Sequence, residues 1–202
     1  MVLGDKEHVL YGRGYIEDVL CGLRFRISSK SFYQVNSAQT ELLYNKALQL
    51  AGLTGKEKVL DAYCGIGTIG LIASRKAGEV IGVELNPDAV RDAVQNAKMN
   101  DVKNIQFYCN DAGRFIVNMA EKGEKVDVIL MDPPRSGSTK EFIDAVAKMG
   151  PERVVYVSCG PETLVRDLRW FMGNGYRAVE AWPGGMFGGT GHTESIVLLQ
   201  KS

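Results

Sequence analysis

The sequence predicts an α/β fold built on a doubly wound, mostly parallel sheet. From residue 58 onward, strand-like and helix-like segments alternate along the chain. Such regular alternation is typical of a parallel sheet with helices on both faces. The last two strand-like segments, 176–183 and 194–200, have no helix of useful length between them, which predicts an antiparallel edge strand.

The N-terminal part of the chain has a different pattern. Residues 8–28 read as short strands interrupted by glycines. We therefore expect a short β-rich segment over 1–35, followed by one larger domain over 36–202. Apolar residues at helical spacing predict that this domain starts with a helix capped by Ser37 and ended near Gly52.

The remaining elements follow from the same patterns. The predicted helices are 68–78, 87–100, 113–123, 138–150 and 161–175. The predicted strands, seven in number, are 58–63, 79–85, 105–111, 125–132, 153–159, 176–183 and 194–200.

Composition bounds the classes of function. Apolar residues make up 45% of the 202 residues, and 24 basic residues balance 24 acidic ones. A zero net charge argues against a self-sufficient nucleic-acid binder, because phosphate contacts require a basic surplus. No apolar stretch approaches the roughly 20 residues that cross a bilayer, and residues 1–12 lack the apolar region of a signal peptide. The four cysteines show no metal-like spacing, so we expect reduced thiols, no metal, no membrane contact and a cytoplasmic location.

Polar side chains end five successive predicted strands: Asp61, Glu84, Asp111, Asp132 and Cys159. Ligands of open α/β sheets bind outside the carboxyl ends of the strands. An acid at this place could instead cap the following helix. Capping would explain one or two of these acids, whereas four in succession favour a ligand site.

A glycine-rich loop follows the first of these strands. The stretch DAYCGIGTIG (61–70) contains the G-x-G-x-x-G pattern, which lets a ligand approach the backbone at a helix N-terminus. This pattern also fits an NAD-linked oxidoreductase, with Glu84 holding the ribose. Asp61 favours a cationic ligand without phosphate, such as S-adenosylmethionine. In that case Glu84 would hold the ribose hydroxyls and Asp111 would lie near the adenine.

The stretch MDPPRSG (131–137) predicts a rigid loop at the same edge. Its two prolines stiffen the chain and remove two backbone donors. Asp132 lies at the base of this loop, with Arg135 nearby.

Six segments resemble, in order, those of the RNA uracil-5-methyltransferases, which make 5-methyluridine in tRNA and ribosomal RNA. They are SFYQVNSAQTELLY (31–44), VLDAYCGIGTIGL (59–71), GVELNPDAV (82–90), DPPRSG (132–137), SCGPETLVRDL (158–168) and MFGGTGHTES (186–195). The resemblance implies a Rossmann-like methyltransferase sheet of seven strands, S-adenosylmethionine as cofactor and RNA as partner. It covers the catalytic domain only. The N-terminal RNA-binding parts of full-length members, and the iron–sulfur cluster of some, have no match here, so we expect weak RNA binding.

The resemblance also implies roles for individual residues. Cys159 corresponds to the nucleophile and Glu194 to the base. Phe32 would stack on the flipped uracil, and Arg135 would contact the substrate. The residues implied in binding the methyl donor are Gln34, Tyr63, Gly65, Thr68, Glu84, Asp111 and Asp132, with Thr68 and Asp111 as peripheral contacts.

The chemistry of such an enzyme explains these residue types. Carbon 5 of uracil is a poor nucleophile until a thiolate adds to carbon 6, which requires a thiol of lowered pKa. Cys159 precedes a helix that begins near Pro161, so we expect the positive helix end to lower its pKa. Arg135 either lowers this pKa further or polarises a uracil oxygen. A base then removes the proton from carbon 5. His192 is the alternative to Glu194 for this role.

This chain departs from the family pattern at two positions. The family usually has Asn or Asp where this chain has Gly160, and Pro where it has Gly188. Three other interpretations compete with this one: an amino-group methyltransferase, an NAD-linked oxidoreductase, and a fragment that binds the methyl donor without turnover. We expect Cys64 to serve packing, and Cys109, which alternates with apolar residues in its strand, to lie in the core.

Overall fold

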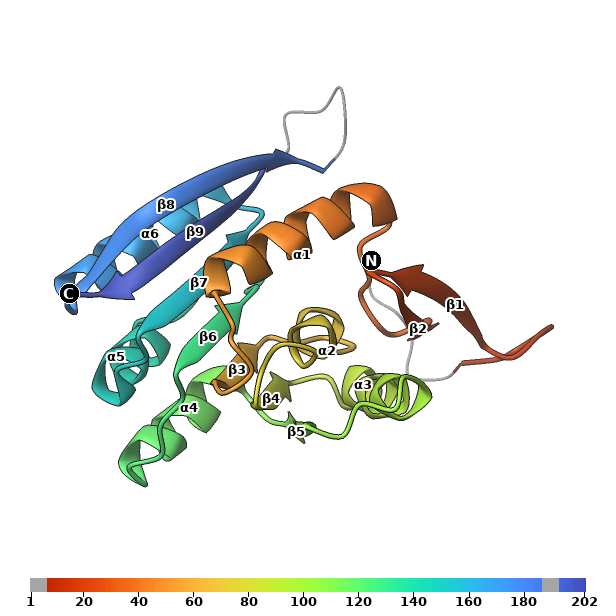
Figure 1. Cartoon of the computed structure of the whole chain (residues 1–202). Coiled ribbons are helices and arrows are strands. Elements are labelled where there is room, and N and C mark those ends of the chain that lie inside the picture. Colours follow the sequence, from red (N-terminus) through yellow and green to blue (C-terminus); the bar gives the residue numbers. More distant parts are fainter. Residues whose placement is uncertain (1–6, 187–192) are drawn as a thin grey trace.

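The computed structural model describes residues 7–186 and 193–202, and within them one large sheet organises the chain (Figure 1). This sheet has seven strands among the described residues, in the order β5-β4-β3-β6-β7-β9-β8. Their bounds are β3 (Lys58–Ala62), β4 (Glu79–Glu84), β5 (Ile105–Cys109), β6 (Val128–Met131), β7 (Arg153–Ser158), β8 (Tyr176–Gly185) and β9 (Thr193–Lys201). The predicted fold class is confirmed.

The last two strands complete the sheet in an order that the sequence does not reveal. The strands from β3 to β7 pair in parallel. The chain then passes over one position, so β8 forms the edge and β9 lies between β7 and β8, antiparallel to both. The antiparallel edge is thus confirmed, and β9 contacts the last parallel strand directly.

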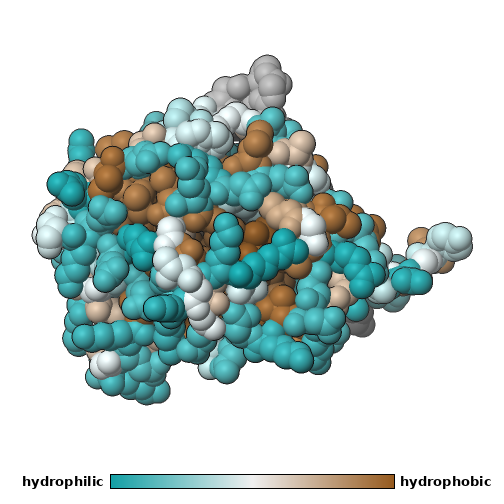
Figure 2. Space-filling model, viewed as in Figure 1, coloured by the Kyte–Doolittle hydropathy of each residue, from teal (hydrophilic) through white to brown (hydrophobic). Residues whose placement is uncertain are grey.

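Helices cover both faces of the sheet (Figure 1). One face packs against α1 (Ser37–Ala51), α2 (Thr68–Ala73) and α3 (Pro87–Met99), and the other against α4 (Ala112–Glu121), α5 (Lys140–Met149) and α6 (Pro161–Gly173). Successive residues of a strand alternate between the two apolar cores, as Val59 and Leu60 of β3 do. Figure 2 shows hydrophilic residues over most of the surface in this view, with hydrophobic residues exposed toward its middle.

The N-terminal strands form a separate hairpin beside α3. Strands β1 (Tyr15–Leu20) and β2 (Leu23–Ser28) pair antiparallel, and their apolar side chains, Leu20 and Phe25 among them, share the core of α1. The other edge of β2 is covered by side chains of α3. Asn96 Oδ1 accepts from the N–H of Arg26 at 2.7 Å. Covering a strand edge in this way prevents further strand pairing.

Some local predictions were wrong. Helix α1 is capped by Asn36, whose side chain accepts from the N–H of Gln39, and not by Ser37, whose hydroxyl donates to Asp18. The helix does end at Gly52. Helix α2 stops at Ala73, because the N–H of Lys76 turns back to the carbonyl of Ala73.

The core position predicted for Cys109 was also wrong. Strand β5 is an edge strand, and the Cys109 thiol is exposed near its end. Cys64 is buried, as predicted. Over the described ranges, the helices all lack the length and apolar character needed to cross a membrane.

Candidate active site at the carboxyl edge of the sheet

Two of the predicted catalytic side chains come from neighbouring strands. Cys159 is the first residue after β7 and is half-buried. Ser158 pairs with Ser195 of β9, and Glu194 is the residue before Ser195. The antiparallel register of β9 therefore carries Glu194 to the edge where β7 ends. The charge of Glu194 contributes to raising the pKa of Cys159, which places the two groups within electrostatic reach.

Asp132 joins this pair from the next strand. It follows the last residue of β6, and its N–H contacts the carbonyl of Ala62 in β3 at 3.4 Å. Burial, and secondarily the charge of Glu194, raises the pKa of Asp132 to about 7. Within the described part of the chain, none of the hydrogen bonds involves the Asp132 carboxylate. This carboxylate is thus available to a ligand.

The electrostatic environment of Cys159 differs from the prediction. Burial raises the pKa of the thiol, and the charges of Glu194 and Asp132 raise it further. Arg135 acts in the opposite direction through a hydrogen bond and its charge, but does not prevail. The predicted lowering of the Cys159 pKa was wrong, because burial, together with the charges of Glu194 and Asp132, outweighs the effect of Arg135.

The glycine-rich loop between β3 and α2 lies at the same edge of the sheet. Glu84 accepts hydrogen bonds from the N–H of Gly65 at 3.1 Å and from the N–H of Asn86 at 2.8 Å. Its carboxylate therefore fixes the loop to the end of β4. Tyr63 has a φ of 64°, a left-handed conformation that is strained for a residue with a side chain. Such strain is common at functional sites.

Asp61 lies beneath this loop and is 1% exposed. It accepts a hydrogen bond from the N–H of Gly70 at 2.8 Å. Burial raises its pKa to about 8, against the effect of the Gly70 bond, and the charges of Asp132 and Glu84 raise it further. Asp61 thus supports the loop from below, beside two other carboxyl groups.

The loop fits a ligand that is cationic and carries hydroxyl groups. Gly65 borders open space, because a Cβ built there would meet nothing within 4 Å. Gly67 faces the opposite way: a Cβ there would lie 2.7 Å from Cζ of Phe107. The Glu84 carboxylate is bonded to this loop, and Asp132 follows the end of β6 at the same edge of the sheet. Carboxylates attract a sulfonium or ammonium group and accept hydrogen bonds from ribose hydroxyls, so these residues fit S-adenosylmethionine.

The other residues predicted to bind the methyl donor or the uracil differ in exposure and in their hydrogen-bond partners. Gln34 is half-buried in the segment before α1, and Phe32 in the same segment is 75% exposed. The Thr68 hydroxyl lies 3.4 Å from that of Tyr44. Asp111 is the N-cap of α4 and accepts from the N–H of Arg114 at 2.9 Å, so helix capping accounts for this carboxylate.

The sequence reasoning missed a buried polar network behind the proline-rich loop. Asp167 of α6 is wholly buried and accepts hydrogen bonds from the N–H of Ser138 and the hydroxyl of Tyr156. Arg166 donates to Asp167 and to loop carbonyls. The available signal was an Arg-Asp pair inside SCGPETLVRDL (158–168), a segment already singled out.

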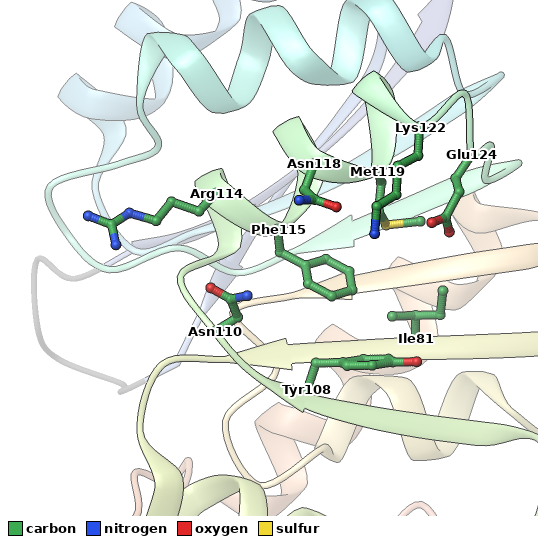
Figure 3. A pocket seen from close by; sticks show the side chains of 9 residues that line it. All are labelled: Ile81, Tyr108, Asn110, Arg114, Phe115, Asn118, Met119, Lys122 and Glu124. Atoms are coloured by element: carbon green, nitrogen blue, oxygen red, sulfur yellow. The ribbon is translucent and has the colours of Figure 1, made fainter.

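A groove of about 500 Å³ lies elsewhere, between α4 and the strands β4 and β5 (Figure 3). The rings of Phe115 and Tyr108 meet across it at 5.0 Å between centroids. None of the site residues predicted from the sequence lines it. His192 and Gly188 lie outside the described residues. Within the described ranges, no cluster of three or more His, Cys, Asp or Glu residues is placed to hold a metal ion.

A family model and two related proteins match nearly the whole chain. A family model described as tRNA (Uracil-5-)-methyltransferase matches residues 4–202. The chain is 51% identical over 201 residues to an uncharacterized RNA methyltransferase of Caldanaerobacter subterraneus subsp. tengcongensis, covering 100% of this chain and 44% of that protein. A protein of the same description from Halalkalibacterium halodurans is 46% identical over 200 residues, 99% of this chain and 44% of its own length. The chain therefore spans less than half the length of these relatives.

Solved structures share the fold. The chain is similar to the tRNA (uracil-54, C5)-methyltransferase of Pyrococcus abyssi in complex with S-adenosyl-L-homocysteine, with a TM-score of 0.80 and 30% identity over 94% of this chain and 45% of that one. A SAM-dependent methyltransferase of Agrobacterium tumefaciens matches with a TM-score of 0.73 and 16% identity, over 98% of this chain and 72% of its own. The second likeness is one of fold alone.

Proposed function

Because the chain belongs to the tRNA (uracil-5-)-methyltransferase family, we propose that it transfers a methyl group from S-adenosylmethionine to carbon 5 of a uridine in RNA. The observation that carries this proposal is the meeting of Cys159, Glu194 and Asp132 at the carboxyl edge of the sheet. A glycine-rich loop with open space at Gly65 lies at the same edge. The proposed substrate is tRNA or ribosomal RNA, and the proposed location is the cytoplasm.

In the proposed reaction, the sulfur of Cys159 adds to carbon 6 of the uracil ring. As this bond forms, the thiol proton passes to the Asp132 carboxylate, whose charge acts on the sulfur, and it returns to the sulfur when the thiol is released. Carbon 5 would then form its bond to the methyl group as the bond between that group and the sulfonium sulfur breaks, with S-adenosylhomocysteine as the leaving group. Glu194 removes the proton from carbon 5, the bond between sulfur and carbon 6 breaks, and the thiol is restored.

S-adenosylmethionine, when bound, supplies a methyl group on a positively charged sulfur. We propose that Glu84 holds its ribose and that Asp132 faces its cationic part. Arg135 and Phe32 would contact the uracil, which must be flipped out of any folded RNA to reach this pocket. The proposed donor contacts are completed by Gln34, Tyr63, Gly65 and Thr68, with Asp111 at the periphery.

The chain length sets one condition on this proposal. Since the relatives are more than twice as long, we propose that this part carries the donor site and the chemistry, and that RNA binding is weak without further modules. Strong and rapid methylation of RNA by these 202 residues alone would contradict that division of labour.

The decisive test uses RNA that contains 5-fluorouridine, together with S-adenosylmethionine. Fluorine cannot leave carbon 5 as a proton does, so the adduct with the protein should persist and be found by mass spectrometry at Cys159. Cys159→Ala should abolish the adduct, whereas Cys21→Ser, which changes a thiol in the turn of the β1–β2 hairpin, should not. The mechanism fails if no adduct forms under conditions where the protein demonstrably binds that RNA.

Glu194→Gln provides the complementary measurement. If Glu194 is the base, this variant should accumulate the covalent adduct on ordinary uridine-containing RNA, because elimination is blocked after methyl transfer. Continued methyl transfer by Cys159→Ala would instead favour an amino-group methyltransferase, which has no use for the thiol.

A further inference from the structure

The loop 132–138 has few internal means of keeping its shape. Pro133 and Pro134 have no backbone N–H to donate. Inside the loop, the N–H of Gly137 bonds to the carbonyl of Pro134 at 2.8 Å. The position of Arg135 beside Cys159 must therefore be fixed largely from outside the loop.

Helix α6 supplies that support from one of its faces. The residues involved are Thr163, Arg166 and Asp167, which lie three and four positions apart and so point to the same side of the helix. The Thr163 hydroxyl contacts the carbonyl of Arg135 at 3.0 Å. Nη2 of Arg166 donates to the carbonyls of Ser136 and Ser138, both at 2.9 Å.

Asp167 completes the support with a buried charge. It is 0% exposed and accepts from the N–H of Ser138 at 2.7 Å and from the hydroxyl of Tyr156 at 2.6 Å. Nε of Arg166 donates to its other oxygen at 2.8 Å. A buried carboxylate is tolerated only when it is paired and hydrogen-bonded in this way. Arg166 is itself held by the ring of Trp170, 5.0 Å from its guanidinium carbon.

The loop approaches these side chains as closely as its backbone allows. Gly137 has a φ of 75°, and a Cβ built there would lie 2.6 Å from both Nη2 of Arg166 and Oδ2 of Asp167. A side chain would therefore force the loop away from α6. The close contact depends on glycine at this position.

The same network reaches the donor half of the site. The Ser138 hydroxyl lies 3.2 Å from that of Tyr63, which belongs to the glycine-rich loop. Helix α6 begins at Pro161, two residues after Cys159. One connected set of side chains thus joins the helix that follows the nucleophile, the proline-rich loop and the glycine-rich loop.

We propose that Arg166 and Asp167 are positioning residues that hold the proline-rich loop so that Arg135 faces the sulfur of Cys159. This inference rests on the proposed function, because the role given to Arg166 and Asp167 is to support Cys159 as the nucleophile. The charge of Arg135 opposes the two carboxylates that disfavour the thiolate. If the loop loosens, Arg135 withdraws and Cys159 becomes less reactive.

The test measures the reactivity of Cys159 and requires neither RNA nor methyl donor. Iodoacetamide alkylation is followed between pH 6 and 10, and the peptide that contains Cys159 is quantified by mass spectrometry. Asp167→Asn keeps the shape of the side chain but removes its charge. We expect it to slow alkylation at neutral pH about threefold and to move the midpoint of the pH profile upward by about half a unit. Arg166→Lys, which keeps the charge but loses the planar fork of donors, should show a smaller change in the same direction.

The control is Glu57→Gln, which also neutralises a hydrogen-bonded carboxylate, but before β3, at the opposite edge of the sheet. It should lower the melting temperature and leave the alkylation profile of Cys159 unchanged. If Asp167→Asn does not fold, Thr163→Val removes the hydroxyl contacts to the carbonyls of Arg135 and Gly160 and should still raise the midpoint. Unchanged profiles in the folded variants would overturn the proposal. Alkylation by iodoacetamide does not depend on methyl transfer. The effect of these variants on Cys159 can therefore be measured even if the protein does not methylate uridine.

Discussion

Strand β3 has a buried carboxyl group near each of its ends, and the pKa values of the two groups are shifted in opposite directions. Glu57, just before the strand, has its pKa lowered to about 2, chiefly by the hydrogen bond from the Thr54 hydroxyl at 2.6 Å. The N–H groups of Thr54 and Lys56 contribute further bonds. Asp61, in the penultimate position of the strand, has its pKa raised to about 8 by burial.

The difference lies in what surrounds each carboxylate. At the amino edge of the sheet, donors of the same turn satisfy Glu57, so its charge is stable there. At the carboxyl edge, the N–H of Gly70 donates to Asp61, while Asp132 and Glu84 add further negative charge. Groups with strongly perturbed pKa values gather at functional sites more often than elsewhere. The amino edge is thus built for stability, whereas at the carboxyl edge negative charge gathers around Asp61, where it would favour a cationic ligand.

The largest expected effect concerns Asp61. Its folded-state pKa lies above its unfolded value of 3.8, so folding takes up a proton between about pH 4 and pH 8, and the stability linked to Asp61 is lost as the pH rises through this range. Asp61→Asn removes this linkage. In the parent protein, the free energy of unfolding, measured with urea, should fall as the pH rises from 5 to 8. We expect this fall to be smaller in the variant by on the order of 3 kcal/mol. Parallel pH dependences in the two proteins would refute the raised pKa.

Glu57→Gln should have a smaller effect with the opposite dependence on pH. A lowered folded-state pKa contributes stability above the unfolded value of 4.5 and loses it as the pH falls toward 2. We expect the variant to lose about 1–2 kcal/mol at pH 7, because charge-assisted hydrogen bonds become neutral ones. Urea unfolding at several pH values should show the gap narrowing below pH 4.5. A gap that widened toward acid would show that Glu57 is not the stabilised anion described here.

The smallest effect is expected at Gly160, the N-cap of α6, whose lack of a side chain leaves this helix without a side-chain cap. A Cβ at this position would lie 2.8 Å from the Thr163 hydroxyl and 3.2 Å from the carbonyl of Arg135. An Asn side chain can cap the helix, and an Ala side chain cannot, yet both crowd the same neighbours. We expect Gly160→Asn to be more stable than Gly160→Ala by about 1 kcal/mol, measured by thermal unfolding. Equal stabilities would show that crowding, and not capping, governs this position.

Much of the fold and part of the candidate site follow from the sequence. The alternation of apolar and polar residues located the strands and helices, and Pro87 and Pro161 each stand at the first position of a helix. Because parallel strands present their carboxyl ends at one edge, the order of polar residues along the chain also placed Asp132 and Cys159 at that edge. These features depend on local patterns and on one rule of topology.

The order of the strands in the sheet and the interactions of the charged side chains could not be predicted from such local patterns. Asp111 turned out to cap a helix, and Cys109 is exposed because β5 is the edge strand. The pairing of Arg166 and Asp167 with the proline-rich loop joins residues about thirty positions apart. Such contacts leave no periodic signal in the sequence.

By itself, the sequence determined the fold class, the edge where the polar residues gather and the identity of the candidate nucleophile. Only the tertiary structure decided that β9 pairs directly with β7 and so brings Glu194 to Cys159. It also decided the direction of the pKa shift at the thiol, which is upward. The physical reason is that a pKa depends on burial and on distances between charges, and these distances are set by strands that lie far apart in the chain.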